Sequence, residues 1–283
     1  MNLNEQKLCF IGAGNMANAI IGGLCKKGFP AQNITACDPS EQNLERLKQQ
    51  WNIETETDNQ QAAAQAGVII LCVKPQILKL VCEALSPALS HQPLIISIAA
   101  GLELSSIEPW LGSGLVKSLG NDLAIIRCMP NTPAQVLKGA SGLFANPSVS
   151  KAQKEITTTL FSAIGVVEWV DDEQKMHSVT ALSGSGPAYI FLVIEAMEAA
   201  AIKQGIPAET ARKLAAQTVA GAAEMVLNSD LEPAQLKRNV MSPGGTTERA
   251  IHMFESLDLV PIFEQAMNAA QERSVALSEQ LKS

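Results

Sequence analysis

The feature that most constrains the fold of this chain is a glycine-rich turn directly after its first apolar segment. Residues 7–11 are typical of a short buried strand, and Gly12-Ala13-Gly14-Asn15-Met16-Ala17 follows without a spacer. In such a G-x-G-x-x-A turn, the first glycine bends the chain, the second lets backbone approach a pyrophosphate, and the small third residue lets the next helix pack closely. The order strand, turn, helix therefore predicts a dinucleotide-binding unit. We expect cofactor contacts from Gly12, Ala13, Gly14, Asn15 and Met16.

Apolar runs continue to alternate with helical patterns through residue 168. Further buried strands are expected at residues 34–37, 68–73, 94–98 and 124–128, with helices near 40–50, 58–66, 76–89 and 104–111. This alternation is typical of a doubly wound parallel sheet, which binds its ligands at the carboxyl ends of its strands. The turns expected there contain prolines or small residues, namely Lys74-Pro75, Ala99-Ala100-Gly101 and Met129-Pro130-Asn131-Thr132-Pro133.

The second predicted strand ends at Asp38. An acidic residue at this position commonly accepts hydrogen bonds from the adenine ribose of NAD and repels the extra phosphate of NADP. The nearby cations Arg46 and Lys48 fall inside the next predicted helix, where solvent exposure is the expected role. Ser40 and Asn59 are nevertheless able to hydrogen-bond a phosphate. Taken alone, this corner favours NAD, but it leaves the cofactor preference open.

Composition excludes several classes of partner. The 283-residue chain is 47% hydrophobic and 17% charged, with a net charge of −7 and no cluster of basic residues. Nucleic acid and anionic membrane are therefore not expected as partners. All six cysteines lie in the first half without C-x-x-C spacing, which indicates buried free thiols in a reducing compartment. No secretion signal is recognised, and Glu195 and Glu198 interrupt the longest late apolar run, so we expect a cytoplasmic protein without a membrane span.

The second half of the chain shows helical patterns without strand-like runs. We therefore predict two domains, one of residues 1–168 and one of residues 169–283. Residues 187–204 carry only three charged side chains, so this predicted helix must be covered on most sides. The last helix carries apolar residues at alternating steps of three and four, interrupted by one polar residue, Ser274. We predict a homodimer built through this half, with a purely intramolecular helical bundle as the alternative.

A second glycine turn lies near the C-terminus. Ser242-Pro243-Gly244-Gly245 cannot continue a helix, and Thr246-Thr247 then opens an amphipathic helical pattern. A turn that ends at a helix N-terminus collects unpaired N–H donors and the positive end of the helix dipole. The segment is therefore expected to leave its backbone amides free to bind a small anion. An ordinary helix cap is the alternative interpretation.

With both turns in view, the chain resembles the pyrroline-5-carboxylate reductases, the last enzymes of proline biosynthesis. The likeness runs nearly end to end. It is carried by residues 10–16, Val73-Lys74-Pro75, Ala99-Ala100-Gly101, residues 129–133, residues 182–189 and residues 236–247. Met241 and Asp38 depart from the family pattern, where small or small polar residues are usual.

The resemblance implies an α/β fold, with an N-terminal Rossmann-like doubly wound domain and an all-α C-terminal dimerisation domain that completes the active site in a second subunit. Similar proteins also form higher rings of dimers. By resemblance, NADPH is the cofactor and NADH is also used, with Asn59, Val73, Lys74, Pro75, Ala100 and Gly101 lining the site. The substrate, 1-pyrroline-5-carboxylate, would be held by Ser242, Pro243, Gly244, Gly245, Thr246 and Thr247, with Thr247 hydrogen-bonded to the ring nitrogen.

Reduction of such an imine requires hydride transfer to a carbon that is electrophilic when the nitrogen is protonated. No catalytic acid or metal site accompanies the motifs, and His91, His177 and His252 are each expected at the surface. A reductase of a related six-membered cyclic imine acid would use every feature named here. A non-catalytic nucleotide-sensing scaffold would need the first turn but not the second. The β-hydroxyacid dehydrogenases share the first turn, and they resemble one another in a helix lysine that follows a glycine-rich segment. Here the glycine-rich segment Gly184-Ser185-Gly186 is followed by no lysine until Lys203.

Overall fold

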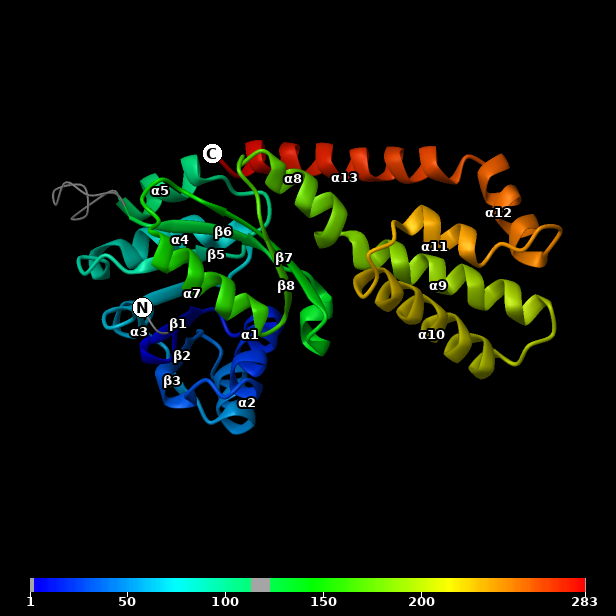
Figure 1. Cartoon of the computed structure of the whole chain (residues 1–283). Helices are drawn as coiled ribbons and strands as arrows, with labels where there is room; N and C mark the ends of the chain where they lie inside the picture. Colours follow the sequence, from blue (N-terminus) through cyan, green and yellow to red (C-terminus); the bar gives the residue numbers. More distant parts are fainter. Residues whose placement is uncertain (1–2, 113–122, 283) are drawn as a thin grey trace. The chain divides into compact units, whose positions relative to one another are not determined.

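The first half of the chain forms one twisted sheet in the computed structural model, which describes residues 3–112 and 123–282 (Figure 1). Its strands follow the order β3-β2-β1-β4-β5-β6-β7-β8. They are β1 Leu8–Ile11, β2 Ile34–Cys37, β3 Glu54–Glu56, β4 Val68–Leu71, β5 Leu94–Ser97, β6 Ile125–Met129, β7 Gly139–Ala145 and β8 Gly165–Trp169. All pairings are parallel except that of β6 with β7. The predicted α/β doubly wound fold is thereby confirmed.

Helices cover both faces of the sheet because alternate strand residues point to opposite sides. Leu8 and Phe10 of β1 join one buried core, whereas Cys9 and Ile11 join the other. The first core is shared with α1 Asn15–Lys26, α2 Glu41–Trp51 and α7 Lys151–Ser162, and the second with α3 Asn59–Ala63, α4 Pro75–Leu85 and α5 Leu104–Gly112. Short 3-10 turns lie at η1 Leu3–Glu5, η2 Ala31–Asn33, η3 Ser86–Ala88 and η4 Thr132–Val136.

Three strands lack the apolar runs that predicted the others. β3 has the sequence Glu-Thr-Glu and pairs only with β2 at the edge of the sheet. β7 begins Gly-Ala-Ser-Gly, and β8 alternates between more and less exposed residues. Central parallel strands are buried on both faces and read as apolar, whereas the edge strands β3 and β8 need not be. β7 lies inside the sheet, but small residues make up most of its sequence. These three strands were therefore not predicted.

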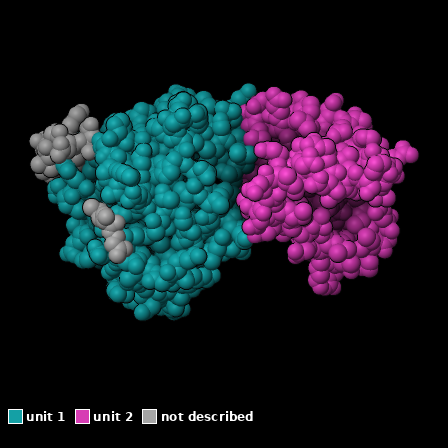
Figure 2. All heavy atoms as spheres, viewed as in Figure 1, with its two compact units in different colours: residues 1–185, 270–283 teal, residues 186–269 magenta. Residues whose placement is uncertain are grey.

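The chain divides into two units, coloured in Figure 2. Unit 1 consists of residues 1–185 together with 270–283, and unit 2 of residues 186–269. After β8 come α8 Lys175–Val179 and a π-helical turn, η5 Thr180–Gly184. The last strand ends at Trp169, close to the predicted boundary at residue 168, whereas unit 2 begins at Gly186. The domain division at residues 168 and 169 stays a prediction.

Unit 2 is entirely helical in the described chain. It contains α9 Gly186–Lys203, α10 Ala208–Leu227, α11 Pro233–Asn239, α12 Thr246–Ser256 and the first part of α13 Leu259–Leu281. Its apolar side chains are largely uncovered within one chain. Phe191 is 63% exposed, Leu214 56% and Phe254 52%, although fully burying such side chains would stabilise each by about 1.5–3 kcal/mol.

By length and composition alone, one helical segment of the described residues, Lys175–Lys203, is able to cross a membrane. Glu195 and Glu198 therefore do not keep the segment from meeting these two criteria, and the expectation that the chain has no membrane span stays a prediction. None of the apolar stretch is buried inside the chain. The same exposure is what a helix at a subunit interface would show.

Candidate active site

The glycine turn after β1 requires a glycine at its first position. Gly12 has φ +104°, and a Cβ atom there would lie 2.7 Å from the carbonyl oxygen of Cys72. Its amide donates to the carbonyl of Cys37 at 2.7 Å, which ties the turn to the end of β2. Because a positive φ strains any residue with a Cβ, this position combines a conformational and a steric requirement.

The second glycine of the turn faces open space. Gly14 is the N-cap of α1, and a Cβ built on it meets no heavy atom within 4 Å. Behind it, Ala17 is completely buried, so the helix packs closely on the sheet. The first N–H groups of α1 have no partners inside the helix and carry the positive end of its dipole. The turn therefore has the shape and the donors that a pyrophosphate needs.

The strand order reverses beside this turn. The chain runs from β1 outward to β2 and β3, and then returns to place β4 on the other side of β1. In doubly wound sheets, ligands bind at the carboxyl ends of the strands where such a reversal occurs. The structure brings the predicted cofactor residues to these ends. Gly12, Ala13, Gly14, Asn15 and Met16 follow β1, Asp38 follows β2, Asn59 follows β3, Val73, Lys74 and Pro75 follow β4, and Ala100 and Gly101 follow β5.

Asp38 braces the glycine turn through its carboxylate. One oxygen accepts a hydrogen bond from the amide of Ala13 at 2.8 Å, and the other accepts one from the amide of Ser40 at 2.9 Å. Arg46 approaches the same turn from α2, donating from Nη2 to the carbonyl oxygen of Ala13 at 3.0 Å. The expectation that Arg46 merely faces solvent is therefore incomplete. Its side chain is exposed, but its guanidinium group contacts the glycine turn after β1.

The second glycine turn lies in unit 2 and opens α12, as predicted, with Gly245 as the N-cap. Gly244 has φ +70°, which again suits glycine. The amide of Gly244 donates to a carboxylate oxygen of Glu248 at 2.8 Å, and that of Gly245 donates to the carbonyl of Ser242 at 2.9 Å. The prediction of free amides is thus wrong for these two groups. The first-turn amides of Thr246 and Thr247 cannot be satisfied by the helix itself.

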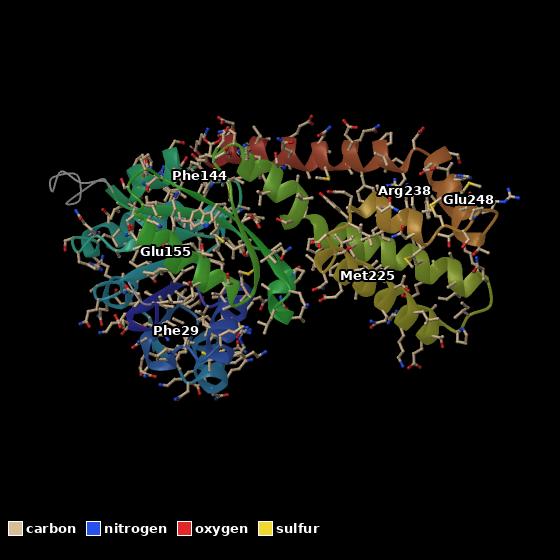
Figure 3. All side chains as sticks on the ribbon, in the orientation of Figure 1. Phe29, Phe144, Glu155, Met225, Arg238 and Glu248 are labelled. Atoms are coloured by element: carbon tan, nitrogen blue, oxygen red, sulfur yellow. The ribbon has the colours of Figure 1, made fainter. Side chains whose placement is uncertain are left out.

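Glu248, labelled in Figure 3, was not singled out from the sequence. It stands three residues after the N-cap Gly245, the spacing at which a glutamate reaches back to amides before a helix in a capping box. That spacing is the signal that would have found it. The contact also has a chemical meaning, because a carboxylate already sits on an amide that was expected to bind a carboxylate.

His177 is not at the surface, contrary to expectation. Its side chain is 1% exposed, and Nδ1 lies 2.9 Å from the hydroxyl of Ser274 in α13. Nε2 has no hydrogen-bond partner among the described residues and lies 3.6 Å from Oε1 of Glu103. His91 and His252 are exposed, as predicted. The buried contact explains the one polar residue in the apolar pattern of the last helix.

Among its described residues, unit 1 contains two ion pairs that involve buried or partly buried groups, one of them at the Glu103 beside this histidine. Burial raises the pKa of Glu103, but hydrogen bonds from Lys282 and Gln174 and the charge of Lys282 more than offset it, so the pKa lies below its usual value. Lys282 lies 3.1 Å from Oε2 of Glu103. Arg127, which is buried, pairs with Glu173 at 2.7 Å. These contacts join residues far apart in sequence and were not predicted.

All six cysteines are free, as predicted from their spacing. Burial, with smaller contributions from nearby acidic groups, raises the pKa of Cys37 and of Cys82 to about 12. Thiolates are the reactive form of cysteine, so both thiols are unreactive near neutral pH. These cysteines contribute packing rather than chemistry.

Comparison with known proteins decides the family. The model for pyrroline-5-carboxylate reductase dimerisation matches residues 173–277, and the model for coenzyme F420-dependent NADP oxidoreductases matches residues 7–101. A pyrroline-5-carboxylate reductase of Pseudomonas aeruginosa is 48% identical over 279 residues, covering 99% of each chain. The chain belongs to the pyrroline-5-carboxylate reductase family. One from Escherichia coli is 39% identical and covers 97% of this chain and 99% of its own.

Solved structures agree with this assignment. A pyrroline-5-carboxylate reductase from Coxiella burnetii superposes with a TM-score of 0.90 at 43% identity, covering 96% of this chain and 98% of its own. The Plasmodium falciparum enzyme, solved with NADP bound, gives a TM-score of 0.84 at 31% identity and covers 98% of this chain and 100% of its own. A ketol-acid reductoisomerase shares the fold alone, at 13% identity and a TM-score of 0.67.

Family membership makes this chain an oxidoreductase that uses a nicotinamide cofactor, with NADPH supported as predicted. The match to the family's dimerisation domain spans all of unit 2, which supports the predicted homodimer. The exposed apolar side chains of unit 2 gain a physical explanation, because a second copy would cover them.

Proposed function

We propose that this chain reduces 1-pyrroline-5-carboxylate to L-proline, the last step of proline biosynthesis, with NADPH as the preferred cofactor and NADH as a usable one. The full-length 48% identity to the Pseudomonas aeruginosa pyrroline-5-carboxylate reductase carries this conclusion. Two features of the chain support it independently. A glycine turn that leads into a helix stands at the switch point of the sheet, and a second glycine turn opens α12.

The cofactor residues fit a dinucleotide. The open space at Gly14 and the first-turn amides of α1 suit the pyrophosphate, and the turns at residues 73–75 and 100–101 suit the nicotinamide half. The bound cofactor supplies the hydride. The remaining task of the protein is to hold the substrate close to the nicotinamide and in the right orientation, and such positioning accounts for a large part of many enzymatic rate enhancements.

The substrate carboxylate is proposed to bind at residues 242–247. The Glu248 carboxylate on the Gly244 amide supports this role, because it is the same chemical group on the same kind of donor. Glu248 would release that amide when substrate binds. Thr247, half-buried in the first turn of α12, is proposed to hydrogen-bond the ring nitrogen and orient the imine carbon. No histidine is assigned to proton transfer.

The proposal extends to a homodimer in the cytoplasm, possessing two active sites and able to assemble further into a ring of dimers. The reducing environment implied by six free cysteines supports the cytoplasmic location. Sedimentation at micromolar concentration tests the assembly, and a monomer would contradict it.

Substrate class is tested by product analysis with three imines. The purified protein with NADPH should convert 1-pyrroline-5-carboxylate to L-proline, detected by chiral chromatography. It should act at least about 100-fold less efficiently on 1-pyrroline, because this imine lacks the carboxylate and leaves the hydrogen-bond donors of residues 242–247 unpaired. The six-membered cyclic imine acid is the third arm. If that ring is reduced more efficiently than the five-membered one, the substrate assignment is wrong.

A further inference from the structure

We propose that Arg46 selects NADP(H) over NAD(H) by binding the 2′-phosphate of the adenine ribose, while Asp38 holds the glycine turn instead of the ribose. The proposal rests on the proposed use of a dinucleotide at this turn. Two observations about the cofactor disagree. An acidic residue at the end of β2 favours NAD, whereas a relative was solved with NADP bound, and the proposed role of Arg46 accounts for both.

The fold sets the place of the ribose. In a dinucleotide-binding sheet, the adenine ribose hydroxyls lie beside the end of the second strand, next to the glycine turn. Here that place is bordered by Asp38, Ala13 and the start of α2. Both carboxylate oxygens of Asp38 already accept backbone hydrogen bonds, at 2.8 Å from Ala13 and 2.9 Å from Ser40. The carboxylate is therefore turned toward the protein backbone, and its charge is partly neutralised by two N–H dipoles.

Arg46 brings the opposite charge to the same place. Its Nη2 donates to the carbonyl of Ala13 at 3.0 Å, the residue whose amide is bound by Asp38. A guanidinium group has five N–H donors, so this single bond leaves most of them for a ligand. The planar fork matches phosphate oxygens in pairs. The bond to Ala13 thus fixes a cation at the edge of the turn with its other donors available.

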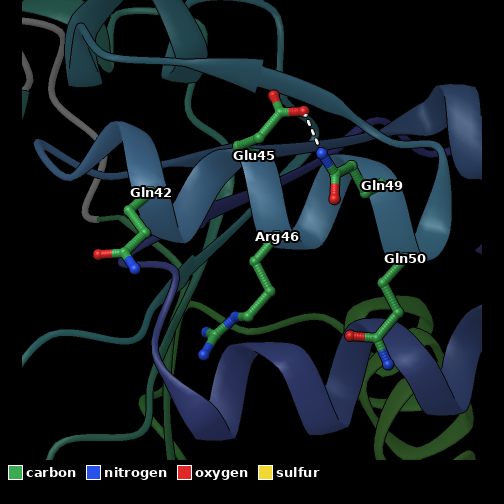
Figure 4. A pocket seen from close by; sticks show the side chains of 5 residues that line it. All are labelled: Gln42, Glu45, Arg46, Gln49 and Gln50. Carbon is green, nitrogen blue, oxygen red and sulfur yellow. Dashed lines mark hydrogen bonds between the residues drawn. The ribbon is translucent and has the colours of Figure 1, made fainter.

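The surroundings of Arg46 leave room for a phosphate. Arg46 lines an open pocket on the exposed side of α2 together with Gln42, Glu45, Gln49 and Gln50 (Figure 4). In Figure 4 the side chains of Glu45 and Arg46 point in different directions from α2, and the Glu45 carboxylate accepts a hydrogen bond from Gln49 at 2.7 Å. The Glu45 carboxylate is thus bound to an amide, and the other side chains that share the pocket with Arg46 are three neutral amides.

A purely structural role for Arg46 makes a different prediction. If the guanidinium group only supports the Ala13 carbonyl, its loss would loosen the glycine turn for every nucleotide. NADPH and NADH would then suffer equally. A role in binding the 2′-phosphate predicts a loss confined to ligands that carry this group.

The experiment compares Arg46→Gln with a matched control, Lys48→Gln, which removes the same charge from an exposed position two residues along α2. Calorimetry measures binding of adenosine 2′,5′-bisphosphate and adenosine 5′-monophosphate, and steady-state kinetics give kcat/KM for NADPH and NADH. Arg46→Gln should weaken 2′,5′-bisphosphate binding and lower kcat/KM for NADPH by about 10- to 100-fold, the range for a charge-assisted hydrogen bond. The affinity for adenosine 5′-monophosphate and the kcat/KM for NADH, neither of which involves a 2′-phosphate, should change by less than about twofold.

Lys48→Gln should leave the ratio of kcat/KM for NADPH to kcat/KM for NADH unchanged. Equal losses for both nucleotides in Arg46→Gln, or no loss for either, would overturn the proposal. Retained NADH-dependent turnover in this variant would show that the reductase function stands apart from cofactor choice. Should the wild-type protein reduce no imine at all, calorimetry would still decide the role of Arg46.

Discussion

Alanine substitution at the two turn glycines should separate folding from cofactor binding. At Gly12, with φ +104°, an added Cβ would lie 2.7 Å from the Cys72 carbonyl oxygen and 2.9 Å from its carbon. These are backbone atoms, and the Cys72 amide is bonded to Ile11 at 2.7 Å, so they cannot rotate aside. A strained backbone conformation alone costs roughly 1–3 kcal/mol, and the clash adds to it. Since 1 kcal/mol shifts Tm by about 2–4 °C at this size, Gly12→Ala should lower Tm by about 10 °C.

Gly14→Ala is the control for folding and the test for binding. An added Cβ meets no heavy atom within 4 Å, and the φ of −76° suits any residue. Replacing an N-cap glycine costs less than about 1 kcal/mol, so Tm should fall by no more than about 4 °C. The methyl group would occupy the space proposed for the pyrophosphate. Loss of one charge-assisted hydrogen bond would weaken NADPH binding by about 10- to 100-fold.

Thermal unfolding and calorimetric titration with NADPH provide the two readouts for this pair. Gly14→Ala protein that binds NADPH as tightly as wild type would refute the placement of the cofactor at this turn. Gly12→Ala protein that unfolds at the wild-type temperature would refute the steric argument.

Three further substitutions test the proposed substrate site at the start of α12 and the ionised carboxylate of Glu103. Thr247→Ala should lower kcat by at least about tenfold while calorimetry shows unchanged NADPH binding, and unchanged kcat would remove Thr247 from the mechanism. Glu248→Ala should lower KM for the imine acid by about two- to tenfold, because an internal carboxylate no longer competes for the Gly244 amide, whereas a raised KM would mean that Glu248 assists binding. The pKa of Glu103 is lowered in the folded protein, so its charge stabilises the fold above its ordinary pKa of 4.5 and this contribution disappears as the pH falls through the folded value. Glu103→Gln should therefore unfold at a lower temperature than wild type near pH 7, with the two melting temperatures converging as the pH falls below 4.5, and a difference independent of pH would contradict this.

The central sheet was predictable because parallel strands buried on both faces have continuous apolar sequences. β1 and β4 are wholly apolar, and β2, β5 and β6 each contain a single polar residue. The edge strand β3 is polar, and β7 is rich in small residues, so neither produced that signal. Pairing across the sheet defines these strands, and a pattern within one segment does not report it.

The candidate site was predictable where local backbone conformation dictates the residue. Gly12 and Gly244 both have positive φ, and their turns were found from the sequence. Contacts between distant segments were not found, such as the hydrogen bond of His177 with Ser274, 97 positions apart. The contact of Arg46 with Ala13 is of the same kind, because only the folded α2 brings that cation to the turn. Residue type alone placed Asp38 at the ribose, whereas its hydrogen bonds hold it on the backbone.

The most direct test of the proposed reductase follows nicotinamide absorbance when the purified wild-type protein meets 1-pyrroline-5-carboxylate. NADPH and NADH are supplied in parallel reactions at equal concentration. We predict rapid oxidation of NADPH and slower but measurable oxidation of NADH, each dependent on the imine. Absence of oxidation with either cofactor, although both bind, would contradict the assignment of this chain as a reductase.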